Sequence, residues 1–334
     1  MTPLSDDAVT RLREAATWPD LSGTRYTAVR ALGRGGMGTV YLAHDAVLER
    51  DVAIKVAGSL PGSDVLARRL RTEARVLARL EHPGIVPIHD AGVLADGRVF
   101  YVMKRIDGRT LADVLREPRP LAERLRVFER VCEPVAFAHA RGLVHRDLKP
   151  DNVMVGSFGE VLVLDWGVAK VLGGDVADDP AVHHGEPSAP GDTEPGTVMG
   201  TPGFMPPEQA AGEAGRVDQR SDVYALGAIM FQLLAGRAPP SGDDPRPVVA
   251  RLRDVPKRLR AICTKALSPA AADRYPDAGA LAADLARLRA GEAVIAYPET
   301  ILDRIGRVAM AYRTAIVLVL AYLILRVMVA IVAG

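Results

Sequence analysis

The sequence predicts an α+β protein with two lobes, the first rich in strands and the second rich in helices. Short runs of alternating polar and apolar residues fill residues 26–104, whereas apolar residues at helical spacing dominate from residue 110 onward. An apolar run at the C-terminal end predicts a transmembrane helix over residues 314–334. We expect a ligand site in the cleft between the lobes, where such sites are common.

The composition is that of a globular protein with balanced charge. The 334 residues can hold one large domain or two, and 42 basic against 41 acidic residues leave a formal net charge of +1. A nucleic-acid-binding protein would normally carry a strongly basic stripe, so we expect no nucleic-acid partner. Cys132 and Cys263 lie far apart in helix-like stretches, and we expect both to be reduced thiols in the core.

The elements of the first lobe follow from local patterns. We expect residues 1–25 to form a weakly structured tail. Residues 63–80 carry apolar side chains at helical spacing and predict a helix. Strands are predicted over residues 26–32, 39–44, 51–57, 85–90 and 99–104, the first three as an antiparallel meander.

The second lobe reads as helices with one interruption. Residues 173–196 hold almost no apolar side chains, so we expect a mobile loop. Residues 290–313 are expected to be a juxtamembrane linker. Helices are predicted over residues 111–116, 121–141, 221–234, 248–267 and 278–290.

The densest group of chemically useful side chains lies in residues 143–152. Asp147 can take a proton from a hydroxyl, Lys149 can lie against a phosphate, and Asn152 can offer an amide oxygen to a hard metal ion. Asp165 follows an apolar run and supplies a second metal-binding oxygen.

A glycine-rich turn precedes this group. The pattern Gly33-x-Gly35-x-x-Gly38 can bring backbone N–H groups close to phosphate oxygens, but alone it also fits a dinucleotide-binding turn or a flexible hairpin. A strand follows it here, whereas a dinucleotide-binding fold would need a helix. That context favours a nucleotide site. Lys55 in the next strand and Glu73 in the next helix are candidate residues for it, although each alone could be a solvated residue of its element.

In order and spacing, these motifs resemble those of the protein kinase family, and Lys149 is typical of its serine/threonine branch. As a whole, the sequence resembles the bacterial-type (Hanks-type) serine/threonine kinases. The resemblance covers residues 26–289 and implies a bilobal protein-kinase-like fold, with an N-lobe over 26–104 and a C-lobe over 108–289.

The resemblance also assigns roles in the transfer of a phosphoryl group from ATP. Asp147 would orient the substrate hydroxyl and accept its proton, and Lys149 would neutralise the transferring group. Asn152 and Asp165 would hold Mg²⁺, and Lys55 would pair with the α and β phosphates.

The expected nucleotide surface has two parts. Met103 would guard the back of the adenine pocket, and backbone groups of Lys104 and Ile106 would bind the purine. Apolar side chains would cover the faces of the adenine, namely Leu32, Val40, Ala53 and Met154. The glycine-rich turn under the phosphates would consist of Gly33, Arg34, Gly35, Gly36, Met37, Gly38 and Thr39.

Residues after the catalytic segment have supporting roles by the same resemblance. We expect a buried ion pair between Glu208 and Arg274 and expect Asp222 to brace the catalytic loop, although a helix cap is the alternative for Asp222. Trp166 stands where the family usually has phenylalanine, and we expect it to pack against the helix of Glu73.

The loop after Trp166 is expected to be regulated by phosphate. Arg146 would form a cationic pocket once a loop threonine is phosphorylated, with Thr193 and Thr197 as the predicted autophosphorylation sites. Thr201 would bond near Asp147 and Lys149.

The C-terminal run predicts a single-pass protein of the cell membrane. Residues 315–334 contain nineteen uncharged residues and Arg326. Arg304, Arg307 and Arg313 precede the run and would keep the kinase portion in the cytoplasm. The alternative is a helix that docks on the second lobe, because Arg326 interrupts the run.

We therefore expect a serine/threonine protein kinase that uses ATP and Mg²⁺ and acts on Ser/Thr hydroxyls of protein substrates. Two copies could form a homodimer for autophosphorylation in trans. A membrane-anchored pseudokinase scaffold that only binds nucleotide is the alternative of another class, and a kinase of small molecules is a third.

Overall fold

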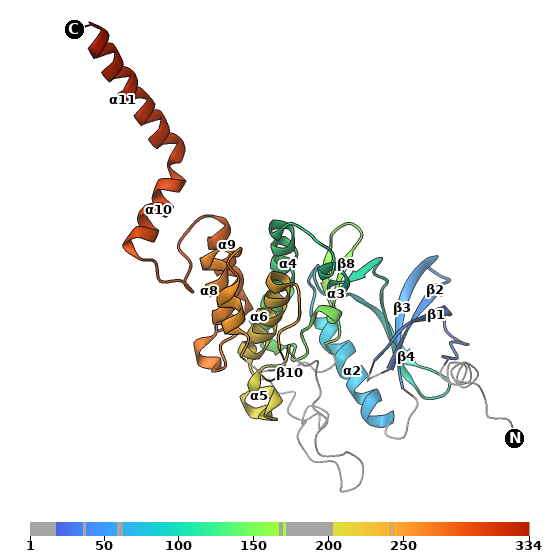
Figure 1. Cartoon of the computed structure of the whole chain (residues 1–334). Helices are drawn as coiled ribbons and strands as arrows, with labels where there is room; N and C mark the ends of the chain where they lie inside the picture. Colours follow the sequence, from blue (N-terminus) through green and yellow to red (C-terminus); the bar gives the residue numbers. More distant parts are fainter. Residues whose placement is uncertain are drawn as a thin grey trace, which may run out of the picture.

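The computed structural model describes residues 18–35, 38–58, 63–166, 170–171, 203–240, 242 and 244–333. The chain forms a strand-rich lobe followed by a helical lobe (Figure 1). This arrangement confirms the predicted bilobal α+β fold.

A five-stranded antiparallel sheet forms the first lobe, in the order β1-β2-β3-β5-β4. The predicted meander is confirmed. The fourth strand begins later than predicted, because the buried Ile85 pairs with Val163 of the other lobe instead. The strands are β1 (Tyr26–Gly35), β2 (Gly38–Asp45), β3 (Arg50–Ala57), β4 (Ile88–Val93) and β5 (Val99–Lys104).

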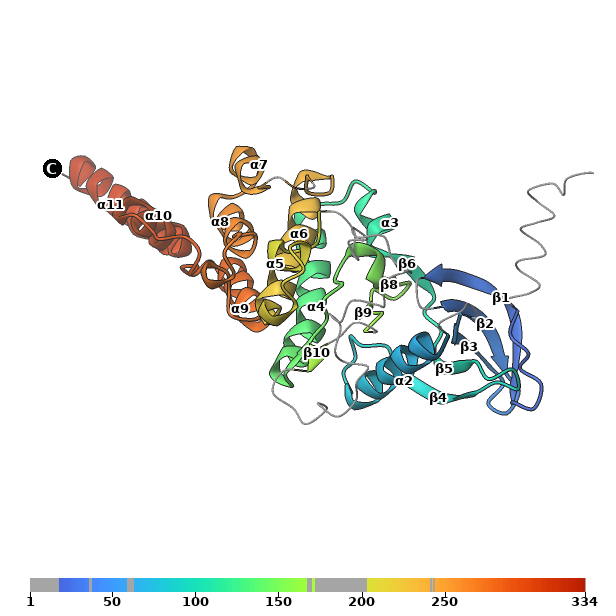
Figure 2. The ribbon, with the colours of Figure 1, turned by 90° about the horizontal axis from the view of Figure 1, so that it is seen from below.

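Helix α2 (Ser63–Arg79) lies beside the sheet, near β4 and β5 (Figure 2). Leu70 and Leu77 recur at helical spacing and are buried in a core cluster with Tyr101 of β5. The helical face that buries these leucines also carries Glu73, which is how the sequence brings a carboxylate to the sheet.

The segment before β1 packs on a second core cluster of the sheet. Leu21 is buried there, and the ring of Trp18 meets that of Tyr41 edge to face at 5.4 Å. Residues 18–25 contain no helix or strand, but they pack on the sheet, and the prediction of a tail did not include that packing. It missed this packing because two apolar residues in a short polar stretch give no periodic signal.

The helical lobe centres on α4 and α6. The predicted helix over 248–267 is in fact two helices, because Pro256 lacks the N–H that a continuous helix would need and instead precedes α8. Cys132 and Cys263 are buried and free, as predicted. The helices are α3 (Leu111–Leu115), α4 (Leu121–Ala140), α5 (Pro207–Ala210), α6 (Gln219–Ala235), α7 (Arg246–Arg251), α8 (Lys257–Ala266) and α9 (Ala278–Arg289).

Short strands flank the segments expected to carry the chemistry. A three-stranded sheet has the order β6-β8-β9, and β10 pairs with β7. These strands are β6 (Gly108–Thr110), β7 (Leu143–Val144), β8 (Val153–Gly156), β9 (Val161–Val163) and β10 (Lys170–Val171).

The segment after α9 is tied to the helical lobe. The buried Asp284 accepts hydrogen bonds from the backbone N–H groups of Ile295 and Ala296, at 2.6 and 3.0 Å. Glu299 pairs with Arg258 at 2.7 Å and also with Arg307. The first part of the predicted linker is therefore held against the lobe.

Two helices follow, α10 (Ile301–Ala311) and α11 (Arg313–Ala333), and both extend away from the helical lobe (Figure 1). Within the described ranges, none of the helices combines the length and the apolar character that crossing a membrane requires. The predicted span over 314–334 is not confirmed.

Candidate active site

A buried cation meets two carboxylates where the lobes face each other. β3 presents Lys55, whose Nζ lies 2.9 and 2.8 Å from the two carboxylate oxygens of Glu73 on α2. The same Nζ lies 2.8 Å from Oδ1 of Asp165, which follows β9. Lys55 is 8% exposed and Glu73 is 1% exposed. Three distant segments thus converge on one ammonium group.

Lys55 and Asp165 each stabilise the ionised form of the other. Burial tends to lower the pKa of Lys55, but Glu73 and Asp165 outweigh burial and raise its pKa. Burial tends to raise the pKa of Asp165, but the charge and hydrogen bond of Lys55 outweigh it and lower that pKa. The ammonium and the Asp165 carboxylate therefore stay ionised at neutral pH.

The second group lies in the loop after β7. Nζ of Lys149 lies 2.9 Å from Oδ2 of Asp147. Asn152, at the end of a short 3₁₀ turn (Pro150–Asn152), donates its side-chain N–H to the backbone carbonyl of Asp147 at 2.8 Å and to Oδ2 at 3.1 Å. The three predicted residues therefore lie together, and the Asn152 amide fixes both the backbone and the carboxylate of Asp147.

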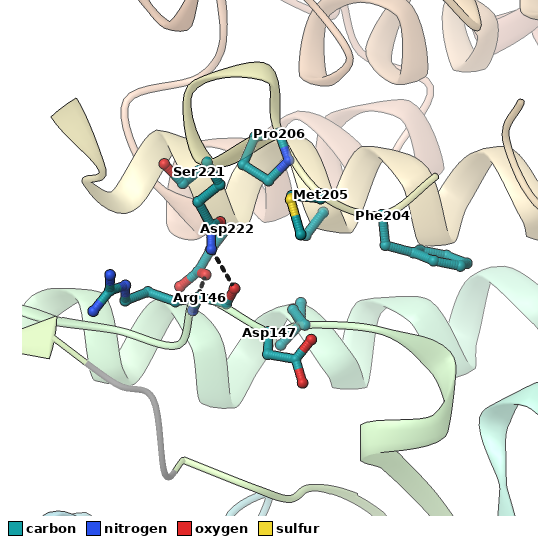
Figure 3. A pocket seen from close by; sticks show the side chains of 10 residues that line it. Arg146, Asp147, Phe204, Met205, Pro206, Ser221 and Asp222 are labelled. Atoms are coloured by element: carbon teal, nitrogen blue, oxygen red, sulfur yellow. Dashed lines mark hydrogen bonds between the residues drawn. The ribbon is translucent and has the colours of Figure 1, made fainter. Parts of the chain in front are cut away.

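Asp222 of α6 holds this loop from behind. Its carboxylate accepts the backbone N–H of His145 at 2.7 Å. It also accepts the backbone N–H of Arg146 at 2.9 Å (Figure 3). His139 contacts the same carboxylate through Nε2 at 2.9 Å, and Nδ1 of His139 accepts the N–H of Ala278. Nε2 must therefore carry the hydrogen. The predicted bracing role of Asp222 is confirmed, and the helix cap is instead Asp218.

A small pocket opens beside Asp147. Phe204, Met205 and Pro206 line one side of it, opposite the loop of Arg146 and Asp147 (Figure 3). Gln209 ties this segment to the loop by donating to the backbone carbonyl of Arg146 at 2.8 Å.

The predicted ion pair between Glu208 and Arg274 is confirmed. Two guanidinium nitrogens contact the two carboxylate oxygens at 2.7 and 2.9 Å, and the Ser221 hydroxyl donates to Oε1 at 2.7 Å. The Arg274 side chain is 0% exposed. Such a bidentate, fully hydrogen-bonded pair compensates the cost of burying both charges.

Trp166 is buried in the main core cluster, and its packing against the helix of Glu73 stays a prediction. Its indole N–H donates to the carbonyl of Val163 at 3.3 Å, and the centres of the Trp166 and His145 rings lie 4.6 Å apart. His145 in turn contacts the carbonyl of Leu164 at 2.9 Å. These contacts fix the chain on both sides of Asp165, which has a φ of 61°.

The pairing of β2, β3 and β5 places four of the residues expected to bind the nucleotide on one face of the sheet. Val40 is paired with Lys55 and Ala53 with Met103 across neighbouring strands. Since residues two apart share a face, these four side chains point the same way. Leu32 of β1 is exposed.

The other residues expected to contact the adenine lie between the lobes and in the second lobe. The backbone N–H of Lys104 donates to the carbonyl of Pro87 at 3.2 Å. Ile106 follows directly, and Met154 comes from β8 of the second lobe.

The described part of the glycine-rich turn has room above it. A Cβ at Gly33 or Gly35 would meet no protein atom within 4 Å, so internal packing does not require glycine there. At Gly38, with φ 152°, a Cβ would collide with the carbonyl oxygen of Val56 at 2.0 Å. Arg34 and Thr39 pair across the β1–β2 turn.

Some predicted residues lie outside the described ranges. They are Gly36 and Met37 of the turn, Thr193, Thr197 and Thr201, and the whole of the loop over 173–196. Conversely, sequence reasoning missed Tyr101, His145 and Gln209. His145 and Gln209 flank predicted motifs, whereas a tyrosine in an apolar strand gives no functional signal.

The donor set fits a magnesium ion that also contacts phosphates. The Asp165 side chain is 41% exposed, and Asn152 uses its amide nitrogen on Asp147, which leaves its oxygen for a metal. Among the described residues, no three His, Cys, Asp or Glu side chains form a metal cluster. Mg²⁺ commonly takes one or two protein oxygens and completes its shell with phosphates and water, so this sparse set suits it.

Comparisons with known proteins agree with this chemistry. The sequence model described as protein kinase domain matches residues 26–289. The chain is 35% identical over 288 residues to the serine/threonine-protein kinase PknD of Chlamydia caviae, covering 78% of this chain and 31% of that protein. It is 36% identical over 305 residues to the serine/threonine-protein kinase PknB of Mycolicibacterium smegmatis, covering 86% of this chain and 46% of that protein.

The structural comparison points the same way. The crystal structure of the Mycobacterium tuberculosis PknI kinase domain matches with a TM-score of 0.57 and 30% identity, covering 78% of this chain and 94% of that one. The chain spans less than half the length of the two kinases compared by sequence.

Proposed function

This chain belongs to the protein kinase family, of the bacterial serine/threonine type, and on that premise we propose that it transfers the γ-phosphoryl group of ATP to Ser/Thr hydroxyls of proteins. The proposal depends on two clusters of side chains. Lys55 and Glu73 of the first lobe meet Asp165 of the second, and Asp147, Lys149 and Asn152 meet in the loop after β7.

Each group has a role that follows from its surroundings. Asp147, held by Asn152, orients the substrate hydroxyl and accepts its proton. Lys149 lies beside that carboxylate, where it would neutralise charge on the transferring group. Lys55, fixed by Glu73, would pair with the α and β phosphates.

Asn152 and Asp165 would hold Mg²⁺, which would supply positive charge to neutralise the phosphates. The adenine would lie against the sheet face of Val40 and Ala53, with Met154 opposite, and the carbonyl of Lys104 and the N–H of Ile106 would bind its edge.

A pseudokinase scaffold is less well supported, because the general base, the lysine and the metal-binding oxygens are all present and correctly paired. A kinase of small molecules is less well supported because the similar proteins are named serine/threonine-protein kinases.

Transfer of labelled phosphate from ATP to a generic protein substrate, with Mg²⁺, tests the proposal. Removing the general base by Asp147→Asn should lower the rate by about 10²-fold or more. The exposed Asp151, in the same loop, provides a matched control, and Asp151→Asn should stay within about twofold of the wild type. Equal rates for the wild type and Asp147→Asn would refute the proposal.

The same incubation tests autophosphorylation. We propose Thr193 and Thr197 as the acceptors, with transfer between two copies of the chain. Phosphopeptide mapping that finds no phosphate between residues 173 and 201 would refute this part.

We further propose that α11 attaches the chain to the cell membrane, with the kinase portion in the cytoplasm. The large apolar side chains described between Val317 and Met328 are 51% to 65% exposed, an unusual cost in water. Arg304, Arg307 and Arg313 precede them and favour the cytoplasmic side.

A further inference from the structure

Tyr101 lies behind the pair of Lys55 and Glu73, and the transfer chemistry proposed above does not use it. The side chain is 2% exposed, and its hydroxyl donates to Oε1 of Glu73 at 3.0 Å. The same oxygen accepts a hydrogen bond from Lys55 at 2.9 Å. The tyrosine and the lysine therefore share one carboxylate oxygen.

The tyrosine ring also supports the lysine. Tyr101 and Lys55 are direct partners on the neighbouring strands β5 and β3. Nζ of Lys55 lies 5.9 Å from the centre of the ring, within the range in which an aromatic face attracts a cation. One side chain thus contacts both members of the pair.

The Tyr101 hydroxyl gives Glu73 a hydrogen-bond donor besides Lys55, whose ammonium has several partners. Its ammonium already contacts both Glu73 and Asp165, and bound phosphates would compete for the same hydrogens. Burial raises the pKa of Glu73, so its carboxylate depends on nearby donors to stay ionised. The Tyr101 hydroxyl is not a partner of the phosphates, so it gives Glu73 a donor besides the ammonium.

We propose that Tyr101 is a positioning residue that holds Glu73, and with it α2 and Lys55, in the arrangement that binds nucleotide. This inference rests on the proposed function for its nucleotide readout. The alternative is a purely structural role, in which Tyr101 only fills the core and its hydroxyl bonds to Glu73 because a buried hydroxyl needs a partner.

Tyr101→Phe removes the hydroxyl and keeps the ring. Tyr41→Phe is the matched control, because Tyr41 is also buried in this sheet but faces the opposite core cluster beside Trp18. The affinity of the full chain for a fluorescent ATP analogue with Mg²⁺ should fall about threefold to tenfold in Tyr101→Phe and stay within twofold in Tyr41→Phe.

A double-mutant cycle distinguishes positioning from core filling. If Tyr101 acts through the lysine, Tyr101→Phe should have no further effect on analogue affinity in a Lys55→Met background. The same loss in both backgrounds would overturn the inference, as would an unchanged affinity in the single variant.

Amide hydrogen exchange along α2, measured without nucleotide, tests independently whether Tyr101 positions Glu73. Tyr101→Phe should speed exchange in the turns around Glu73 several-fold, and Tyr41→Phe should not. Unchanged exchange would overturn the inference. If the wild type fails to bind the analogue, the proposed function fails, and the exchange result still decides whether Tyr101 holds α2.

Discussion

A single buried carboxylate, that of Asp222, shows how strongly individual residues constrain this site. Burial tends to raise the pKa of Asp222, but the hydrogen bonds from His139 and the Arg146 amide outweigh it and lower the pKa. The carboxylate therefore stabilises the folded chain and the catalytic loop together.

This pKa shift makes stability depend on pH with a defined sign. Because the pKa of Asp222 is lower in the folded chain than in the unfolded one, where it is about 3.9, its contribution is fully present above pH ~5. The contribution is lost as the pH falls through the folded pKa. Asp222→Asn should lower the free energy of unfolding at pH 7 by about 2 kcal/mol, since bonds to a charged acceptor are lost.

Urea unfolding of both chains from pH 7 to pH 3 measures this contribution. The stability difference between wild type and Asp222→Asn should shrink below pH ~4, while the exposed Asp254→Asn should match the wild type throughout. A difference that stays constant down to pH 3 would contradict the assignment.

The sequence predicted contacts between individual residues correctly where both residues of the pair lie in recognisable motifs. The Glu208 to Arg274 pair and the bracing by Asp222 could be predicted because each residue sits in a recognisable segment. Tyr101 could not, since nothing in an apolar strand tells a core tyrosine from one whose hydroxyl reaches a carboxylate on a separate helix.

At the scale of elements, helix α2 and the strands β2, β3 and β5 matched their predicted ranges closely, because local patterns of polar and apolar residues mark them. The break between α7 and α8 was missed because apolar spacing continues through Pro256. The packing of residues 18–25 and the hold on residues 295–299 depend on partners far away in sequence, namely Tyr41, Asp284 and Arg258.

Helix α11 is the element whose environment can be tested directly. The dozen Leu, Ile and Val residues over 315–334 contribute about −0.3 to −0.6 kcal/mol each to insertion, and Arg326 costs roughly 2.5 to 3.5 kcal/mol. The chain should stay in the membrane pellet after alkaline carbonate washing. A variant with Leu320→Asp and Ile324→Asp should be released, because two further charges cancel the gain. Release of the wild type would contradict the proposed anchor.

At the scale of the whole molecule, the fold brings together groups that lie more than a hundred residues apart. β3 and α2 deliver Lys55 and Glu73 from the first lobe, and β9 delivers Asp165 from the second. The strand-then-helix order of the sequence predicted two lobes, and the resemblance predicted which residues face the cleft. Neither predicted the direct contact between Lys55 and Asp165.

A crystal structure of the chain with a non-hydrolysable ATP analogue and Mg²⁺ tests the convergence most directly. We expect Nζ of Lys55 within hydrogen-bond distance of an α or β phosphate, with oxygens of Asn152 and Asp165 on a metal ion at about 2.0 to 2.1 Å. An analogue bound away from Lys55, or a metal that contacts neither Asn152 nor Asp165, would contradict the account.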